Sequence, residues 1–417
     1  MDRAEKLNQQ LAQYHPAAFR CLSPLGKRLF FPQGVPVQAA EARNCRFNAT
    51  IGQLLNDEGR ANPLPSMSAH ISGLRTEDVF QYQAQGGRKE LRQLWRDKIL
   101  REVGCSNISN PVVCMGLTQG LSIAGDLFVD EETDVLLPNP RWGNYDLIFG
   151  VRRLGNIINY KVMDGEGENP THWSFNISGI AEAIARIRHK GVLVLNIPSN
   201  PVGYTPTWEE IRRLVAVIKE AKKPLVIVLD EAYKGMEWED GIINHSLIQE
   251  LSTLDPERFL VMKIDGATKE MFFFGGRIAF VTFVCEGEVA PVLEEKVIGS
   301  IRSSVSALPS PSQALTMTAL QSSTLAAETT AIREMLRERY LVLKELLAHS
   351  SLRNWKYNSA FFALISAPNG AEETRLRLIE AGVGVVSVRA VDSIRLSYST
   401  VPKEELEPMI RIIEKNI

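Results

Sequence analysis

Short apolar runs alternate with helical patterns through the middle of the chain. Between two such runs, residues 207–223 place apolar residues three and four positions apart, which predicts an amphipathic helix. Thr207, with Glu210 three residues later, is typical of the capping box that begins a helix. Continuous apolar runs suit strands buried on both faces, so the alternation predicts an α/β fold with a mostly parallel sheet. The runs occupy 133–140, 191–201, 223–233, 258–266 and 277–284.

The last hundred residues follow a different pattern, with amphipathic helices at 328–350 and 404–417 and short apolar strands between them. This pattern predicts a second, α+β domain. We therefore expect an N-terminal arm, 1–45, that packs with this small domain or against a partner, a large domain at 46–304 and the small domain at 305–417. The short strands fall at 361–368, 383–388 and 393–399.

Composition narrows the classes of function. The formal net charge of -2 over 417 residues gives no basic stripe for nucleic acid, and no window is apolar enough to span a membrane. Five scattered cysteines without a CxxC pair indicate reduced thiols in the cytosol, and six dispersed histidines without an HExxH pair predict no metal site. We expect a cytoplasmic, metal-free protein.

Candidate chemistry lies where the predicted strands end, because ligands of open α/β sheets bind at the carboxyl ends of strands. Lys269 follows the run at 258–266, among Gly and Phe residues. A lysine with a lowered pKa can form a Schiff base, although a surface lysine would fit the same position. Asp230 follows the apolar residues of the run at 223–233. Its carboxylate could pair with a pyridinium nitrogen or cap the next helix. Asn200 lies in an Asn-Pro-x-Gly turn and could donate to a ring oxygen.

Three further features follow the same rule. Gly116 to Gln119 lie at a strand-to-helix junction, where backbone N–H groups and the Thr118 hydroxyl could bind phosphate. Trp142 follows the run at 133–140 and could stack on a flat ligand. Each feature also has an ordinary structural explanation, but they occur in one order, each at the end of a predicted strand.

This ordered set resembles the fold-type I, class I/II aminotransferases, and in particular the aspartate aminotransferase branch, from about residue 47 to about residue 400. The resemblance implies pyridoxal 5′-phosphate as cofactor, an internal aldimine at Lys269, and an exchange of amino groups between an L-amino acid and a 2-oxo acid with ping-pong kinetics. It implies that Asp230 pairs with the pyridinium nitrogen, that Asn200 and Tyr233 bind the ring oxygen and that Trp142 stacks on the ring. The phosphate would be held by Leu117, Thr118, Thr268 and Arg277.

Further matches concern substrate and assembly. Arg395 matches the arginine that binds the substrate α-carboxylate, and Gly52 matches a loop beside the bound amino acid. Tyr82 matches a tyrosine that reaches the phosphate of a second subunit, which implies a homodimer with shared active sites. Arg302 falls where the aspartate branch carries the arginine that binds a side-chain carboxylate across the subunit interface, in the active site of the second subunit.

The chain departs from the family pattern at three places. Gly266 replaces a common serine, which removes one expected phosphate contact, and Asp265 beside it would repel a phosphate. Val305 and Ala307, near Arg302, differ from the residues that the aspartate branch favours. A carbon–sulfur β-lyase on the same fold is an alternative function, and a non-catalytic regulator that binds the cofactor is a more distant one.

Overall fold

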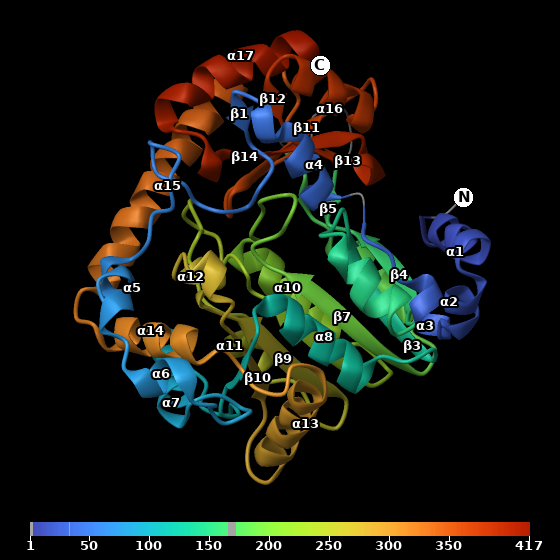
Figure 1. The fold of residues 1–417 in the computed structure, drawn as a ribbon, viewed down its shortest axis with the longest axis vertical. Coiled ribbons are helices and arrows are strands. Elements are labelled where there is room, and N and C mark those ends of the chain that lie inside the picture. Colours follow the sequence, from blue (N-terminus) through green and yellow to red (C-terminus); the bar gives the residue numbers. More distant parts are fainter. Residues whose placement is uncertain (1–2, 33, 166–171) are drawn as a thin grey trace.

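The computed structural model of the chain describes residues 3–32, 34–165 and 172–417. Its centre is a sheet of seven strands in the order β2-β10-β9-β8-β7-β3-β4 (Figure 1). Neighbouring strands from β4 to β9 are parallel, whereas β10 is antiparallel to both of its neighbours. The predicted α/β fold with a mostly parallel sheet is therefore confirmed. The strands are β2 (Val112–Cys114), β3 (Thr133–Asn139), β4 (Asn156–Lys161), β7 (Lys190–Asn196), β8 (Leu225–Asp230), β9 (Phe259–Asp265) and β10 (Ala279–Val284).

Helices cover both faces of this sheet because its strands are apolar on both sides. Ile264 of β9 faces the Gly120 position of α8 (Leu117–Phe128), whereas the next residue, Asp265, accepts a hydrogen bond from Trp95 of α7 (Lys89–Glu102). Successive side chains of a strand point to opposite faces, so α7 and α8 lie on opposite sides of the sheet. The other helices of this part include α9 (Ile177–Ala185), α10 (Trp208–Lys219), α11 (Ile248–Leu251), α12 (Ala267–Glu270) and α13 (Val289–Ser304).

The parallel strands bring their carboxyl ends to one edge of the sheet. Asn196, the last residue of β7, pairs with Asp230, the last residue of β8, and Asp230 pairs with Ile264 of β9. The predicted capping box also forms: Thr207 and Glu210 exchange side-chain and backbone hydrogen bonds at the start of α10. Side chains that follow these strands are therefore held by rigid elements.

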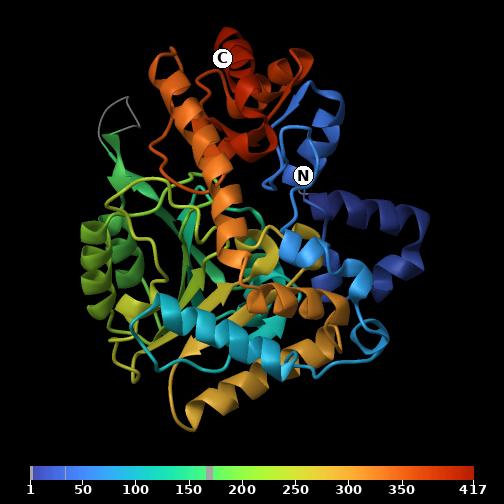
Figure 2. The same cartoon turned by 90° about the vertical axis from the view of Figure 1, so that its left-hand side faces the viewer.

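The C-terminal part contains an antiparallel sheet of β11 (Phe362–Ser366), β14 (Ser393–Ser397) and β13 (Val386–Val388). Its helices are α16 (Ala371–Glu380) and α17 (Leu406–Asn416). The long helix α15 (Leu325–Ala348) runs from the large sheet towards this smaller part (Figure 2). A short strand near the other end of the chain, β1 (Phe47–Asn48), pairs with β12 (Val383–Gly384).

The N-terminal segment touches both parts. Helix α4 (Val35–Glu41) contacts β12 and β13, whereas Arg28, at the end of α3 (Pro24–Arg28), donates to the Val151 carbonyl in the large part. Helix α14 (Ser310–Gln321) contacts α5 (Pro65–Ser68), α6 (Thr76–Phe80) and α7, although it follows residue 305. The domain boundaries stay predictions. In the described ranges, no helix has the length and apolar character needed to cross a bilayer.

Candidate active site

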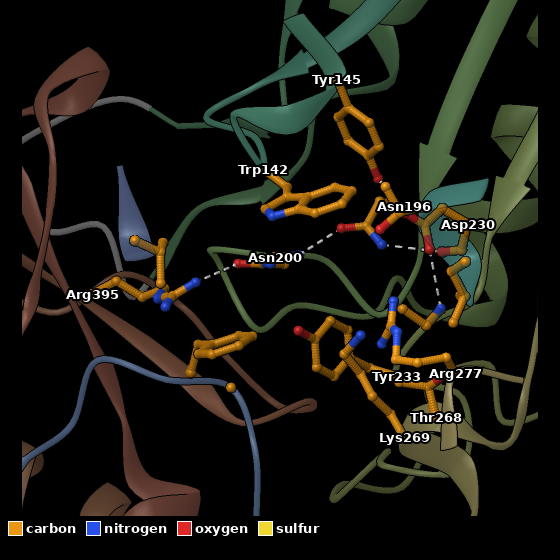
Figure 3. Close-up of a pocket in the computed structure, with 16 residues that line it drawn as sticks. Trp142, Tyr145, Asn196, Asn200, Asp230, Tyr233, Thr268, Lys269, Arg277 and Arg395 are labelled. Carbon is orange, nitrogen blue, oxygen red and sulfur yellow. Dashed lines mark hydrogen bonds between the residues drawn. The ribbon is translucent and has the colours of Figure 1, made fainter. Parts of the chain in front are cut away.

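A cavity of about 260 Å³ opens at the carboxyl edge of the large sheet, where the smaller C-terminal part faces it (Figure 3). Its wall contains eleven of the residues that the sequence suggested. Helices, strand ends and loops from both parts of the chain bring them together. These residues are Gly52, Leu117, Thr118, Trp142, Asn200, Asp230, Tyr233, Thr268, Lys269, Arg277 and Arg395.

Lys269 is carried by the one-turn helix α12, immediately after β9, and its amine reaches the cavity. The Nζ atom lies 5.0 Å from the centre of the Tyr233 ring. Burial lowers the pKa of Lys269 to about 8, against the attraction of Asp230 and with a smaller contribution from Arg277. A far larger share of this amine than of an ordinary lysine is therefore neutral near physiological pH, and the neutral form is the one that a nucleophile or a general base requires.

Asp230 ends β8 with its carboxylate directed to the cavity, and the residue is only 4% exposed. The Tyr145 hydroxyl donates to Oδ2 over 2.5 Å, and the Ala232 N–H donates to Oδ1 over 3.2 Å. The residues that follow form a turn, so Asp230 caps no helix. Burial raises the pKa of Asp230, and the hydrogen bond from Tyr145 opposes that rise.

An anion-binding cradle lies beside Lys269. Helix α8 begins at Leu117, and its first turn faces the cavity together with Thr268 and Arg277. Gly116 has φ +76°, and a Cβ atom there would lie 2.4 Å from Nη2 of Arg277, so only glycine lets the guanidinium approach. Within the described ranges, no carboxylate pairs with Arg277. A helix N-terminus next to an unpaired guanidinium suits a phosphate.

Arg395 stands at the other end of the cavity, on β14. Its Nη1 donates to Asn200 Oδ1 over 3.0 Å and its Nη2 to the Thr50 carbonyl over 2.5 Å. Its Nε is buried without a hydrogen-bond partner, and its guanidinium carbon lies 4.3 Å from the centre of the Phe362 ring. Burial lowers the pKa of Arg395 to about 10, which leaves it a cation at neutral pH. A buried guanidinium without a carboxylate partner in the described residues is suited to bind one from a ligand.

Asn200 is oriented by its neighbours on both sides. Its backbone N–H donates to Asn196 Oδ1 over 2.7 Å, and its side-chain oxygen accepts from Arg395. The amide NH₂ is therefore the group left to donate to a ligand. Gly203, in the same turn, has φ +75°, and a Cβ atom there would lie 2.2 Å from the Phe362 carbonyl oxygen. This close approach seats the turn against the C-terminal part.

The expectation that Asp265 would repel a phosphate is wrong, because its carboxylate points away from α8. The Asp265 carboxylate lies 2.6 Å from the Lys263 amine and accepts from the Trp95 indole, on the face of the sheet opposite α8. Lys263 also pairs with Glu231 over 2.6 Å, and all three charged groups are buried. The negative charge of Asp265 is therefore paired inside the protein. At the adjacent Gly266, a Cβ atom would lie 2.4 Å from Ala279 Cα, so a serine cannot fit there without a backbone shift.

Two of the suggested residues lie outside the cavity. Tyr82, in the segment between α6 and α7, is 93% exposed. Arg302, near the end of α13, is exposed and its Nη1 donates to the Ser306 hydroxyl over 2.7 Å. Both were assigned to the active site of a second subunit, and those roles stay predictions.

The cavity also contains residues that the sequence reasoning missed. Asn196 donates to the Asp230 carbonyl and accepts from Asn200, and its position at a strand end could have marked it. Tyr145 follows Trp142 by three residues, but no pattern shows that its hydroxyl meets Asp230. Phe362 lies within an apolar run and gave no signal. The other lining residues are Val35 and Ala232.

Comparison with known proteins places this arrangement in a family. The chain matches the family described as aminotransferase class I and II over residues 47–413. It is 23% identical over 374 residues to the cytoplasmic isozyme 2 of aspartate aminotransferase from Arabidopsis thaliana, covering 86% of this chain and 89% of that protein. An aminotransferase structure from Anaerococcus prevotii superposes with a TM-score of 0.83 at 19% identity, covering 93% and 98% of the two chains.

A second structure, the aspartate aminotransferase of Thermus thermophilus with maleate, superposes with a TM-score of 0.77 at 23% identity. The superposition covers 95% of this chain and 99% of that one. At these sequence identities the superpositions show only that the folds are alike. The family assignment rests on the family match, which spans most of the chain. The chain is a member of the class I and II aminotransferases, enzymes that depend on pyridoxal 5′-phosphate.

Proposed function

We propose that this aminotransferase moves an amino group between an L-amino acid and a 2-oxo acid, with Lys269 as both the cofactor-binding lysine and the proton carrier. One observation supports the proposal above all: a lysine of lowered pKa and an unpaired buried arginine face the same cavity from opposite ends. The first can hold an aldehyde and move a proton, and the second can hold a carboxylate.

The cavity fits the cofactor of the family at several independent points. The start of α8, with Leu117 and Thr118, would hold the phosphate together with Thr268 and Arg277. Gly116 supports this assignment, because a side chain there would displace the guanidinium. When bound, pyridoxal phosphate supplies an electron sink that makes the Cα proton of an amino acid removable.

The remaining residues would bind and orient. Asp230, held by Tyr145, would keep the ring nitrogen protonated, and Trp142 would stack on the ring. Asn200 and Tyr233 would donate to the ring oxygen. Arg395 would hold the substrate α-carboxylate beside Gly52, which places the Cα proton between the two ends of the cavity. The amine of Lys269 would be placed to accept that proton and later to donate it back.

We further propose a homodimer in which Tyr82 of one subunit completes the active site of the other. Recognition of a dicarboxylate such as aspartate would require Arg302 from the second subunit, because this residue lies outside its own chain's cavity. The cytoplasmic location stays a prediction.

Steady-state kinetics and a Lys269→Ala variant test the proposal. Initial rates measured against both substrates should give parallel double-reciprocal lines, because the first product leaves before the second substrate binds. Lys269→Ala should lower kcat by roughly a thousandfold or more, the range of a lost general base. It should still bind the cofactor, as the change in cofactor absorption on titration would report.

Lys222→Ala is the control for this variant, because Lys222 is highly exposed and should leave kcat unchanged. Intersecting lines, or near-normal transamination by Lys269→Ala, would contradict the proposal. Pyruvate released from cystathionine without any amino acceptor would indicate the β-lyase reaction instead.

A further inference from the structure

A second and larger cavity, of about 860 Å³, adjoins the active-site cavity. It is enclosed by the N-terminal segment around α4, by the loop that follows β3 and by the end of β13. Both cavities share four wall residues, Val35, Trp142, Asn200 and Arg395. A ligand whose carboxylate is bound by Arg395 therefore has its other substituents beside the mouth of this larger space.

About half of the residues that line the larger cavity have apolar side chains. Six of them come from three separate parts of the chain, so the space is built by the fold and not by one loop. They are Phe30, Pro36, Pro140, Leu147, Val386 and Val388. Polar and charged residues complete the wall, and the apolar stretches between them favour an apolar ligand group large enough to displace the water inside.

The charged groups in this wall are already engaged. Arg141 uses all three guanidinium nitrogens: Nε and Nη2 bind Asp146 over 3.1 and 2.6 Å, and Nη1 binds Asn159 Oδ1 over 2.8 Å. Arg389 has a side chain that is 72% exposed and lies 3.4 Å from Glu372. Among the described residues the cavity therefore presents no buried, unpaired cation to a second carboxylate, apart from Arg395 itself.

We propose that the preferred amino donor is an L-amino acid with a large uncharged side chain, aromatic or long aliphatic, which occupies this second cavity. The proposal rests on the proposed function, since it needs Arg395 to hold the α-carboxylate. Small side chains would leave the space filled with water, and a side-chain carboxylate would lose hydration without gaining a partner from this chain.

The test compares four amino donors in the first half-reaction. The purified holoenzyme is mixed with L-phenylalanine, L-leucine, L-alanine or L-aspartate, and the loss of the absorption band of the lysine-bound cofactor is followed. The rate per unit concentration for L-phenylalanine or L-leucine should exceed those for L-alanine and L-aspartate by roughly tenfold or more. Faster reaction of L-alanine or L-aspartate would overturn the proposal. Faster reaction of L-aspartate would in addition support Arg302 as the residue that binds a side-chain carboxylate.

A binding measurement separates recognition from turnover. 3-Phenylpropanoate lacks the amino group and cannot react, so calorimetry on the holoenzyme reports its affinity directly. It should bind roughly tenfold or more tightly than succinate. Tighter binding of succinate would overturn the proposal. If no amino acid altered the cofactor band, the proposed function itself would fail, which is a different outcome from a reversed order of preference.

Substitutions that fill the second cavity test whether the preference for large uncharged side chains arises there. Leu147→Trp and Val388→Trp approach the space from two different elements, so misfolding of one leaves the other as a test. Each should lower the ratio of the L-phenylalanine rate to the L-alanine rate by roughly tenfold. Leu376→Trp, on the exposed surface of α16, is the matched control and should leave this ratio unchanged. Ratios equal to wild type in both folded cavity variants would overturn the assignment.

Discussion

Lys269 holds its proton less tightly than an ordinary lysine, because the protein around it replaces most of the water that would hydrate its charge. The neutral amine is the form that attacks an aldehyde. Half of the Lys269 amines are neutral near pH 8, whereas a lysine with the usual pKa of 10.5 would remain almost fully charged there. The difference gives a pH dependence that can be measured on the chain without its cofactor.

The rate at which the apo protein captures pyridoxal phosphate should rise with pH through about 8 and level off above it. The direction follows from the lowered pKa, since deprotonation creates the reactive amine. Stopped-flow absorbance from about pH 6.5 to about pH 10 measures this rate. A rate that keeps rising towards pH 10 would show that Lys269 has an ordinary pKa in solution.

A second prediction at this scale concerns Tyr145, whose hydroxyl donates to the Asp230 carboxylate. Tyr145→Phe removes that donor and should raise the pKa of Asp230 further, so less of it would be ionised beside the ring nitrogen. A hydrogen bond to a charged group contributes about 1.5–3 kcal/mol, which corresponds to a loss of roughly tenfold or more in kcat/KM.

Tyr160→Phe is the matched control, because the Tyr160 hydroxyl is also buried in this sheet but donates to the Val194 carbonyl. It should keep kcat/KM within about threefold of wild type, since no charged group loses a partner. Equal losses in the two variants would mean that Tyr145 contributes only to packing.

The residue types at strand ends explain how much of the site could be predicted from sequence. Lys269 and Asp230 were suggested because each follows apolar strand residues, at the edge where ligands of open α/β sheets bind. Phe362 and Tyr145 were missed because their positions depend on packing between distant segments. The expected repulsion of a phosphate by Asp265 was also wrong. Lys263 and Asp265 lie two residues apart on one strand, so both side chains point to the face opposite α8, where they pair with each other.

At the scale of elements, strands β8 and β9 are tied together by the buried Lys263, which pairs with Glu231 and Asp265. The two acids lie directly after β8 and at the end of β9, close to the catalytic candidates in sequence. A buried charge without its partner is strongly destabilising. Removal of this amine would therefore take the ion-pair partner from both acids.

Lys263→Met should lower the free energy of unfolding by about 3–5 kcal/mol, because it leaves two carboxylates buried and unpaired. Urea unfolding followed by circular dichroism measures the loss. Lys190→Met removes an exposed pair with Asp130 and should change stability by less than about 1 kcal/mol. A loss for Lys263→Met as small as for this control would show that water or protonation relieves the buried acids.

The pattern of continuous apolar runs predicted β3, β7, β8, β9 and β10, because burial on both faces leaves an unbroken apolar signal, whereas β2 and β4 were not among the predicted runs. It could not predict that β10 is antiparallel to its neighbours, since a buried strand reads the same in either direction. The predicted boundary at residue 305 likewise assigned α14 to the small domain, although α14 contacts α7. A helical pattern shows that a helix has an apolar face but not which element packs against that face.

At the scale of the whole molecule, a site shared between subunits can be tested by complementation. Lys269→Ala and Tyr82→Ala chains are co-expressed, so that half of the dimers are mixed. Each mixed dimer would contain one site with both defects and one intact site. Activity at limiting cofactor should recover to about a quarter of the wild-type value.

Co-expression of Lys269→Ala with Arg395→Ala is the control, because both residues line the cavity of the same chain. No mixed dimer would then contain an intact site, and activity should not recover. Absence of recovery in the Tyr82 pair, with a dimer established by sedimentation, would mean that the sites are not shared through Tyr82.

The pairing of β1 with β12 also bears on how the chain is made. Phe47 and Val383 are neighbours in the fold but are synthesised more than three hundred residues apart. The whole parallel sheet leaves the ribosome before β12 exists, so it can fold while β1 still waits for its partner. Once folded, it holds the two distant segments close together and lowers the entropy cost of joining them. We therefore expect the smaller part to assemble after the large sheet, so that Arg395 reaches the cavity only at that stage.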